Sequence, residues 1–293
     1  MGTKEFRISG WARILLFLFP YFLIVVVFQF IGLVVAGISI DDPLSSISSQ
    51  QHLISSFFDL SGTFLVLWIF MKYIDREKFT ELGFQMKGRL SDFGSGTLVG
   101  FITMLSGFLI LMGIGEIRYS GVNFNVSELL ISILFFLIIA VVEETLIRGY
   151  VLKNLMLSTN KYVALVISSV IFSLMHGANP SMSLFSFIDL FFAGMILGIS
   201  YLYTKNLWFP IGLHFGWNLF QTHFGFNVSG LDVYSLIEIN YTSANLFNGG
   251  EFGFEGSVFS VAAQLLIFAG IVNYYQDPAQ RFFLPGLLFK RSK

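Results

Sequence analysis

Three short groups of residues, most of them polar or ionisable, interrupt long apolar stretches in the second half of the chain. In chain order they are Glu143, Glu144, Arg148, Phe172, His176, His214 and Asn218. A charge at the centre of a membrane helix costs roughly 2.5–3.5 kcal/mol on insertion scales, so it needs a compensating role. Carboxylates and imidazoles are the groups that most often move protons in catalysis. The pattern therefore indicates acid–base chemistry inside an apolar environment.

The first group contains two adjacent carboxylates with different expected partners. Glu144 and Arg148 are four residues apart with the acid first, which is the favourable orientation for an ion pair along a helix. Glu143 lies about 100° around the helix and cannot share that geometry. If it is buried, Glu143 is an unpaired carboxylate suited to general base catalysis. The alternative is that Glu143 lies at the level of the lipid headgroups and is simply solvated.

The second group ends at His176, which precedes a helix-terminating segment at 177–180. If the helices on either side of 158–161 form an antiparallel hairpin, residues equidistant from that turn lie at the same depth. The midpoint between Glu143 and His176 falls within the turn. The two residues are therefore predicted to meet, although an interfacial histidine is the alternative.

The third group places His214 and Asn218 on one helix face, with Gly216 between them. Four-residue spacing brings both side chains to the same side, and the glycine allows close approach of another helix. The alternative is interhelical hydrogen bonding, typically worth about 0.6–2 kcal/mol. Asp189 is a further intramembrane carboxylate, for which a structural role is favoured.

Composition indicates the environment in which these groups must be positioned. The chain has 293 residues, of which 55% are hydrophobic and 12% charged, and its mean hydropathy is +0.76. A water-soluble domain of this length would have too little polar surface. The net charge of -1 and the scattered basic residues exclude nucleic acid as a partner. Because cysteine is absent, disulfides, thiol nucleophiles and cysteine-ligated metals are excluded.

Apolar segments predict an all-α fold, a polytopic transmembrane helix bundle with about eight spans. A helix needs about 20 apolar residues to cross the hydrocarbon core. The fifth and seventh segments are short or interrupted, so a hairpin that enters from one side is an alternative for either. The segments are 14–37, 55–73, 95–115, 128–150, 162–177, 184–203, 206–223 and 257–275.

Basic residues predict the orientation. All of them except Arg118 lie on the loops or at the span ends of one side under this assignment, and the positive-inside rule makes that side cytoplasmic. Both termini are therefore predicted to be cytoplasmic. The opposite loop at 224–256 contains acids but no Lys or Arg, and its Gly and Asn content predicts turns rather than a folded domain. The apolar segment 282–289 predicts an interfacial tail.

The order of the three motifs resembles that of the CPBP intramembrane proteases. This family includes the CAAX prenyl proteases of type 2 and the bacteriocin-processing or Abi-like proteins. The resemblance implies a catalytic helical core at 125–223, preceded by N-terminal transmembrane helices at 1–124. The outer loop, the last transmembrane helix and a cytoplasmic tail then occupy 224–293. The resemblance also implies that the chain is a multi-pass protein located in a bacterial cell membrane.

The resemblance implies an intramembrane endopeptidase that acts on a membrane-associated or lipidated peptide or protein. Glu143 and His176 would activate a water, and His214 and Asn218 would stabilise the oxyanion. Glu144, Arg148 and Phe172 would support them. No cofactor is required in this interpretation, and membrane lipids and the substrate are the expected partners.

Two alternatives to this interpretation stay open. In a zinc variant, Glu143, His176 and His214 would hold Zn²⁺, although the chain lacks a His-Glu-x-x-His motif. In a non-proteolytic variant, the protein is a membrane transporter or a bacteriocin-immunity scaffold. Chains of intramembrane Glu, His and Asp also build proton relays, but no inverted repeat supports a transporter.

Overall fold

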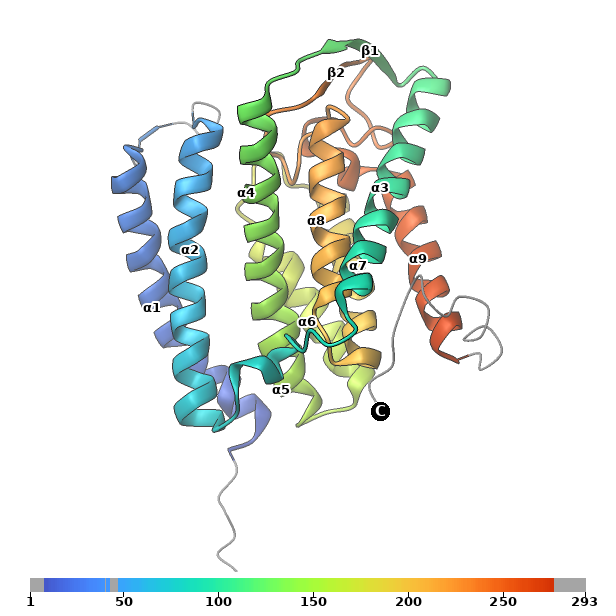
Figure 1. Ribbon diagram of the computed structural model, residues 1–293. Helices are drawn as coiled ribbons and strands as arrows, with labels where there is room; N and C mark the ends of the chain where they lie inside the picture. Colours follow the sequence, from blue (N-terminus) through green and yellow to red (C-terminus); the bar gives the residue numbers. More distant parts are fainter. Residues whose placement is uncertain (1–7, 40, 43–46, 277–293) are drawn as a thin grey trace, which may run out of the picture.

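The computed structural model describes residues 8–39, 41–42 and 47–276, which form a helical bundle (Figure 1). The predicted interfacial tail at 282–289 lies outside the described residues. The long helices are α1 (Gly10–Ala36), α2 (Ser49–Ile69), α3 (Leu90–Gly113), α4 (Val126–Glu144), α6 (Lys161–Met175), α7 (Leu184–Thr204), α8 (Trp208–His223) and α9 (Val258–Gln276). Shorter helical elements are η2 (Phe70–Asp75), η3 (Phe79–Leu82), η4 (Thr145–Leu152), α5 (Lys153–Met156), η5 (Gly250–Phe252) and η6 (Phe254–Gly256).

Six helices among the described residues are long and apolar enough to cross a membrane. They are Gly10–Ala36, Ser49–Asp75, Leu90–Gly113, Val126–Met156, Leu184–Thr204 and Val258–Tyr275. They confirm six of the eight predicted spans and describe an integral membrane protein. The other two predicted spans correspond to α6 and α8, which are helical but contain 15 and 16 residues. Helices of that length fall short of the roughly 20 residues that a simple crossing needs.

The all-α prediction misses a small sheet at one end of the bundle (Figure 1). Strands β1 (Ile117–Val122) and β2 (Ile237–Tyr241) pair antiparallel, with Ile117 opposite Tyr241. Each strand has only five or six residues, and the partner is more than a hundred residues away in the chain. Local periodicity therefore gave no indication of the pairing.

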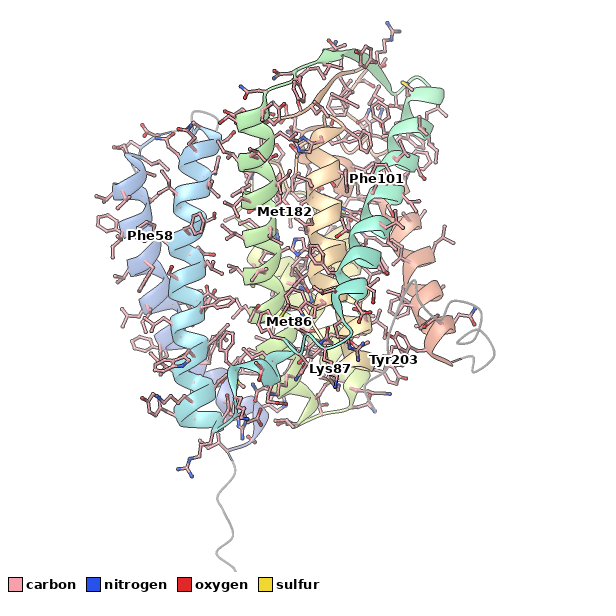
Figure 2. The ribbon with its side chains drawn as sticks, in the orientation of Figure 1. Phe58, Met86, Lys87, Phe101, Met182 and Tyr203 are labelled. Atoms are coloured by element: carbon pink, nitrogen blue, oxygen red, sulfur yellow. The ribbon has the colours of Figure 1, made fainter. Side chains whose placement is uncertain are left out.

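The helix pairs that build the bundle pack closely at glycines. In α1, a Cβ added to Gly32 would lie 3.0 Å from the Cβ of Phe58, which lies on the α1–α2 hairpin in Figure 2. In α8, a Cβ added to Gly216 would lie 2.6 Å from the carbonyl oxygen of Thr97 in α3. This contact of α3 with α8 fixes the helix that carries His214, as small residues do at membrane helix interfaces.

The segment between α8 and α9 packs back into the bundle, in contrast to the predicted turn-rich outer loop. Turns are present, but Phe226, Val228, Phe252 and Phe254 are buried. These apolar side chains anchor the segment because their burial removes them from water. The start of α1 and the end of α9 both lie at the opposite end from β1 and β2 (Figure 1).

Candidate active site

A change of helix type positions the first group of residues. Helix α4 begins at Val126, where the Asn125 side chain accepts hydrogen bonds from the first turn, and it becomes the π-helical η4 directly after Glu144. Such wider turns are frequently found at functional sites. Glu144 and Arg148 are both fully buried here, so the surrounding contacts must satisfy their charges.

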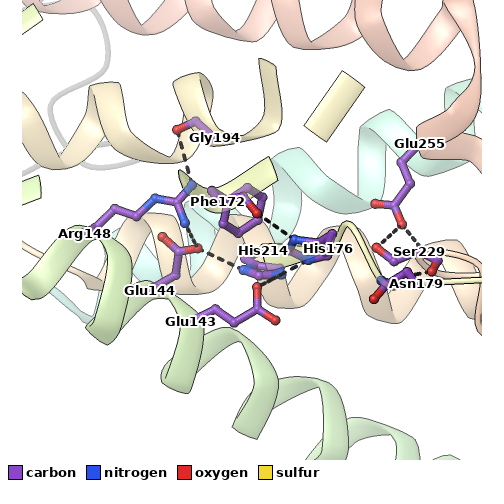
Figure 3. Close-up of polar contacts among 10 residues, drawn as sticks. All are labelled: Glu143, Glu144, Arg148, Phe172, His176, Asn179, Gly194, His214, Ser229 and Glu255. Carbon is purple, nitrogen blue, oxygen red and sulfur yellow. Dashed lines mark hydrogen bonds and ion pairs between the residues drawn. The ribbon is translucent and has the colours of Figure 1, made fainter. Parts of the chain in front are cut away.

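The predicted Glu144–Arg148 ion pair is present and is held from three sides. Arg148 Nη1 lies 3.0 Å from Glu144 Oε1, and Nη2 donates to the Gly194 carbonyl of α7 at 3.2 Å. The guanidinium carbon lies 4.3 Å from the centre of the Phe172 ring, within cation–π range. Figure 3 shows these contacts on one side of the site. Arg148 therefore links the three elements η4, α6 and α7.

His214 approaches the two carboxylates through different ring atoms. Its Nδ1 lies 2.9 Å from Glu144 Oε1, whose charge is stabilised by Arg148. A carboxylate accepts hydrogen bonds, so Nδ1 carries the proton. The Nε2 atom, which carries a lone pair in the neutral ring and a proton in the imidazolium, lies 3.9 Å from Glu143 Oε2.

His176 stands at the C-terminal end of α6 and presents the same ring atom to Glu143. Its Nδ1 lies 2.8 Å from the Phe172 carbonyl oxygen, which can only accept, so Nδ1 donates. Its Nε2 lies 3.8 Å from Glu143 Oε2 (Figure 3). The meeting of Glu143 and His176 that the hairpin midpoint predicted is therefore present in the structure.

Both Nε2 atoms approach the same oxygen of Glu143. The separations of 3.8 and 3.9 Å are too long for direct hydrogen bonds. A water at about 2.8 Å from both atoms could bridge either pair. The Glu143 side chain keeps 20% of its surface exposed. A water at this position would have the Glu143 carboxylate and an imidazole Nε2 as hydrogen-bond acceptors.

A cavity of about 240 Å³ connects the predicted residues. Glu143, Phe172, His176, His214 and Asn218 all line it, and most of the other lining residues are apolar. The Asn218 side chain is buried and finds no hydrogen-bond partner among the described residues. Its amide is therefore available to a bound molecule. The predicted site residues thus share one cavity, with Glu144 and Arg148 behind its wall.

Asp189 lies apart from this cavity and connects two helices. Its Oδ1 accepts hydrogen bonds from Ser260 Oγ at 3.0 Å and from Gln264 Nε2 at 2.6 Å. Both partners belong to α9, while Asp189 belongs to α7. These bonds match the structural role favoured for Asp189.

Sequence reasoning missed Glu255, which also lines the cavity. Its Oε1 accepts hydrogen bonds from the backbone N–H of Ser229 and, at 2.7 Å, from its Oγ. Asn179 Nδ2 donates to the Ser229 carbonyl at 3.1 Å, as Figure 3 shows. Burial raises the pKa of Glu255, while the Ser229 hydrogen bonds and the nearby histidines act in the opposite direction. The only indication of Glu255 in the sequence was the acidic composition of the segment 224–256.

The donor types around Glu143 are those that zinc accepts, namely imidazole nitrogen and carboxylate oxygen. The described part of the chain nevertheless contains no group of three His, Cys, Asp or Glu side chains arranged to hold a metal ion. No step proposed below depends on a metal ion.

Fold and site together describe an integral membrane protein with a buried carboxylate–histidine cluster. A family model described as Type II CAAX prenyl endopeptidase Rce1-like matches residues 125–220. This segment includes all seven residues singled out from the sequence. The resemblance to the CPBP proteases is thereby confirmed over this segment. No curated protein and no solved structure matches the chain.

Proposed function

We propose that the protein is an intramembrane endopeptidase that hydrolyses a peptide bond in a membrane-associated or lipidated substrate. The observation that carries the proposal is the approach of two imidazole Nε2 atoms to the Glu143 carboxylate, at 3.8 and 3.9 Å. The match of residues 125–220 to a prenyl endopeptidase family supports the choice of reaction.

In the proposed reaction Glu143 removes a proton from water, and the water oxygen attacks the carbonyl carbon of the peptide bond. His176 assists by orienting the water through its Nε2 lone pair. Electrons of the carbonyl double bond move onto its oxygen, which gives a tetrahedral oxyanion. The proton held by Glu143 then passes to the leaving nitrogen as the C–N bond breaks. The products are a carboxylate and an amine.

His214 and Asn218 are proposed to stabilise the oxyanion. The Asn218 amide can donate directly. Because His214 Nδ1 already donates to Glu144, its Nε2 can donate only when the ring is an imidazolium. The Glu144 carboxylate would stabilise that cation. A preorganised oxyanion donor is typically worth about 2.7–4 kcal/mol, so either residue should affect the rate strongly.

Phe172 and Arg148 are proposed to position other residues of the site rather than to contact the reacting atoms. Arg148 neutralises and orients Glu144, and the Phe172 ring covers the guanidinium.

Both termini are proposed to face the cytoplasm, and the membrane is proposed to be a bacterial cell membrane. Glu143 lies 17 residues below the first residue of α4, about 26 Å along its axis at 1.5 Å per residue. The reaction would thus take place in the inner half of the membrane.

The proposal is tested with the purified full chain in lipid vesicles that contain a panel of lipidated and transmembrane peptides. Glu143→Ala and His176→Ala should each abolish cleavage while the protein still inserts and purifies. Glu128→Gln is the matched control, because it removes a carboxylate on the same helix about four turns away. Full proteolysis by both active-site variants would show that the assignment of base and partner is wrong.

Metal dependence is tested separately on the same sample. We expect the chelator-treated protein to contain no zinc by elemental analysis and to keep its activity. Loss of activity on chelation, restored by added Zn²⁺, would instead support the zinc variant with Glu143, His176 and His214.

A further inference from the structure

A carboxylate from outside the matched segment reaches the catalytic cavity. Glu255 belongs to the loop between α8 and α9, and it keeps only 5% of its surface exposed. Ser229 fixes one oxygen, Oε1, through its backbone N–H and hydroxyl group. The other oxygen, Oε2, accepts no hydrogen bond from the residues that the structure describes. The fixed carboxylate thus offers a free acceptor to whatever occupies the cavity.

Apart from the imidazole rings of His176 and His214, the cavity provides no cationic group for this carboxylate. Within the described residues its lining contains no Lys or Arg. Arg148, a fully buried base of the same bundle, is already engaged by Glu144, Gly194 and Phe172. A buried charge is costly without a partner, so an unmatched carboxylate favours a ligand that brings a positive charge.

The end of the bundle that carries this loop is also rich in negatively charged residues. The segments at this end carry Asp41, Asp42, Glu116, Glu128, Asp232, Glu238, Glu251 and Glu255, against one base, Arg118. The positive-inside rule explains why bases are scarce here, but Asp and Glu contribute little to it. A field of one sign attracts ligands of the opposite charge.

We propose that Glu255 is a specificity-determining residue that binds the cationic side chain of a Lys or Arg in the substrate. The apolar walls formed by residues such as Phe136, Leu197 and Trp217 would hold the apolar part of the same peptide. This inference rests on the proposed endopeptidase activity and narrows its substrate class. Glu255 would repel a substrate that has a free carboxylate close to the scissile bond.

The test uses the full chain in vesicles and, for each position flanking the cleaved bond, a set of three otherwise identical membrane peptides. The three peptides of a set carry Lys, norleucine or Glu at that position. At one position, the unaltered protein should cleave the Lys peptide with a kcat/KM about tenfold or more above that of the norleucine peptide. This is the range expected for a charge-assisted hydrogen bond. The Glu peptide should be the poorest of the three.

Two variants assign the preference to the residue. Glu255→Gln keeps the acceptor for Ser229 but removes the charge, so the Lys-to-norleucine ratio should fall to about one. Glu255→Asp keeps the charge and should retain a reduced preference. Glu251→Gln is the matched control: Glu251 is an exposed acid of the same loop whose carboxylate accepts from Ser181, and its loss should leave the ratio unchanged.

The outcomes separate the two proposals. If the unaltered protein cleaves all three peptides equally, or if Glu255→Gln keeps the preference, the specificity inference is wrong while the peptidase activity stands. If no peptide is cleaved, the proposed function fails and the inference fails with it. The peptide comparison on the unaltered protein can still overturn the inference if a variant does not fold.

Discussion

At the residue scale, Glu144 organises the site through one oxygen. Its Oε1 accepts from both Arg148 and His214, so it connects the ion pair to the ring that faces Glu143. The spacing of the sequence predicted the first contact because both residues lie on one helix. The second contact, to a residue 70 positions away, has no local signal. The pair within one helix was therefore predictable from its spacing, and this contact between helices was not.

Loss of the buried cation should destabilise the protein. Arg148→Met leaves the fully buried Glu144 without its main counter-charge, which typically costs about 3–5 kcal/mol. Thermal unfolding of the detergent-solubilised protein measures the effect. The double variant Glu144→Gln with Arg148→Met removes both charges and should be more stable than Arg148→Met alone. A single variant as stable as the unaltered protein would contradict the role given to the pair.

The state of Glu255 should make substrate preference depend on pH. Burial raises its pKa above the ordinary carboxyl value, so at mildly acidic pH part of the population is protonated and cannot pair with a cation. Protonation of His176 or His214 in the same cavity would repel a Lys side chain and would lower the ratio at acidic pH in the same direction. The Lys-to-norleucine ratio of kcat/KM should therefore rise as pH increases through the raised pKa. A ratio that stays flat between pH 4 and 8 would oppose this assignment.

At the element scale, the hairpin formed by α4 with η4 and by α6 sets the depth of the site. The midpoint rule works because antiparallel helices rise equally per residue, and it brought Glu143 and His176 together. The short or interrupted apolar segments at 162–177 and 206–223 agree with the short helices α6 and α8. The π-helical η4 was not predicted, since no residue type specifies it.

The connection between α7 and α9 gives a prediction at this scale. Asp189→Ala removes the acceptor of the Ser260 hydroxyl and one of the two acceptors of Gln264 Nε2, which keeps Ser260 Oγ. An unsatisfied buried group costs about 1–3 kcal/mol. Hydrogen exchange followed by mass spectrometry should show faster exchange in α9, with smaller change in α1 and α2. The exposed control Asp232→Asn should behave as the unaltered protein does. Unchanged exchange in α9 would mean that other contacts hold it.

At the scale of the whole molecule, composition was enough to predict a membrane bundle, and six of the eight predicted spans are confirmed by length and hydropathy. Composition could not predict that the loop between α8 and α9 packs back into the bundle. Its buried aromatic residues, Phe252 and Phe254, are scattered among glycines and have no helical period. Glu255 arrives in the cavity with this loop and was missed for that reason.

Orientation is tested through the absence of cysteine in the chain, because one introduced thiol is then unique. Asp232→Cys should react with a membrane-impermeant thiol reagent on intact cells, since its loop is proposed to face outward. Lys78→Cys should react only after the cells are opened. Labelling of Lys78→Cys on intact cells, without labelling of Asp232→Cys, would reverse the proposed orientation.

The most direct test of the account is the rate at which Glu143→Gln cleaves a membrane peptide that the unaltered protein cleaves. Gln keeps the size of the side chain but cannot accept the proton of water, so the rate should fall by about 10²–10⁴-fold, the usual contribution of a general base. Mass spectrometry of the fragments, with Glu128→Gln as the active control, gives the rates. A Glu143→Gln variant that cleaves the peptide as fast as the control would contradict the central claim that this carboxylate activates water.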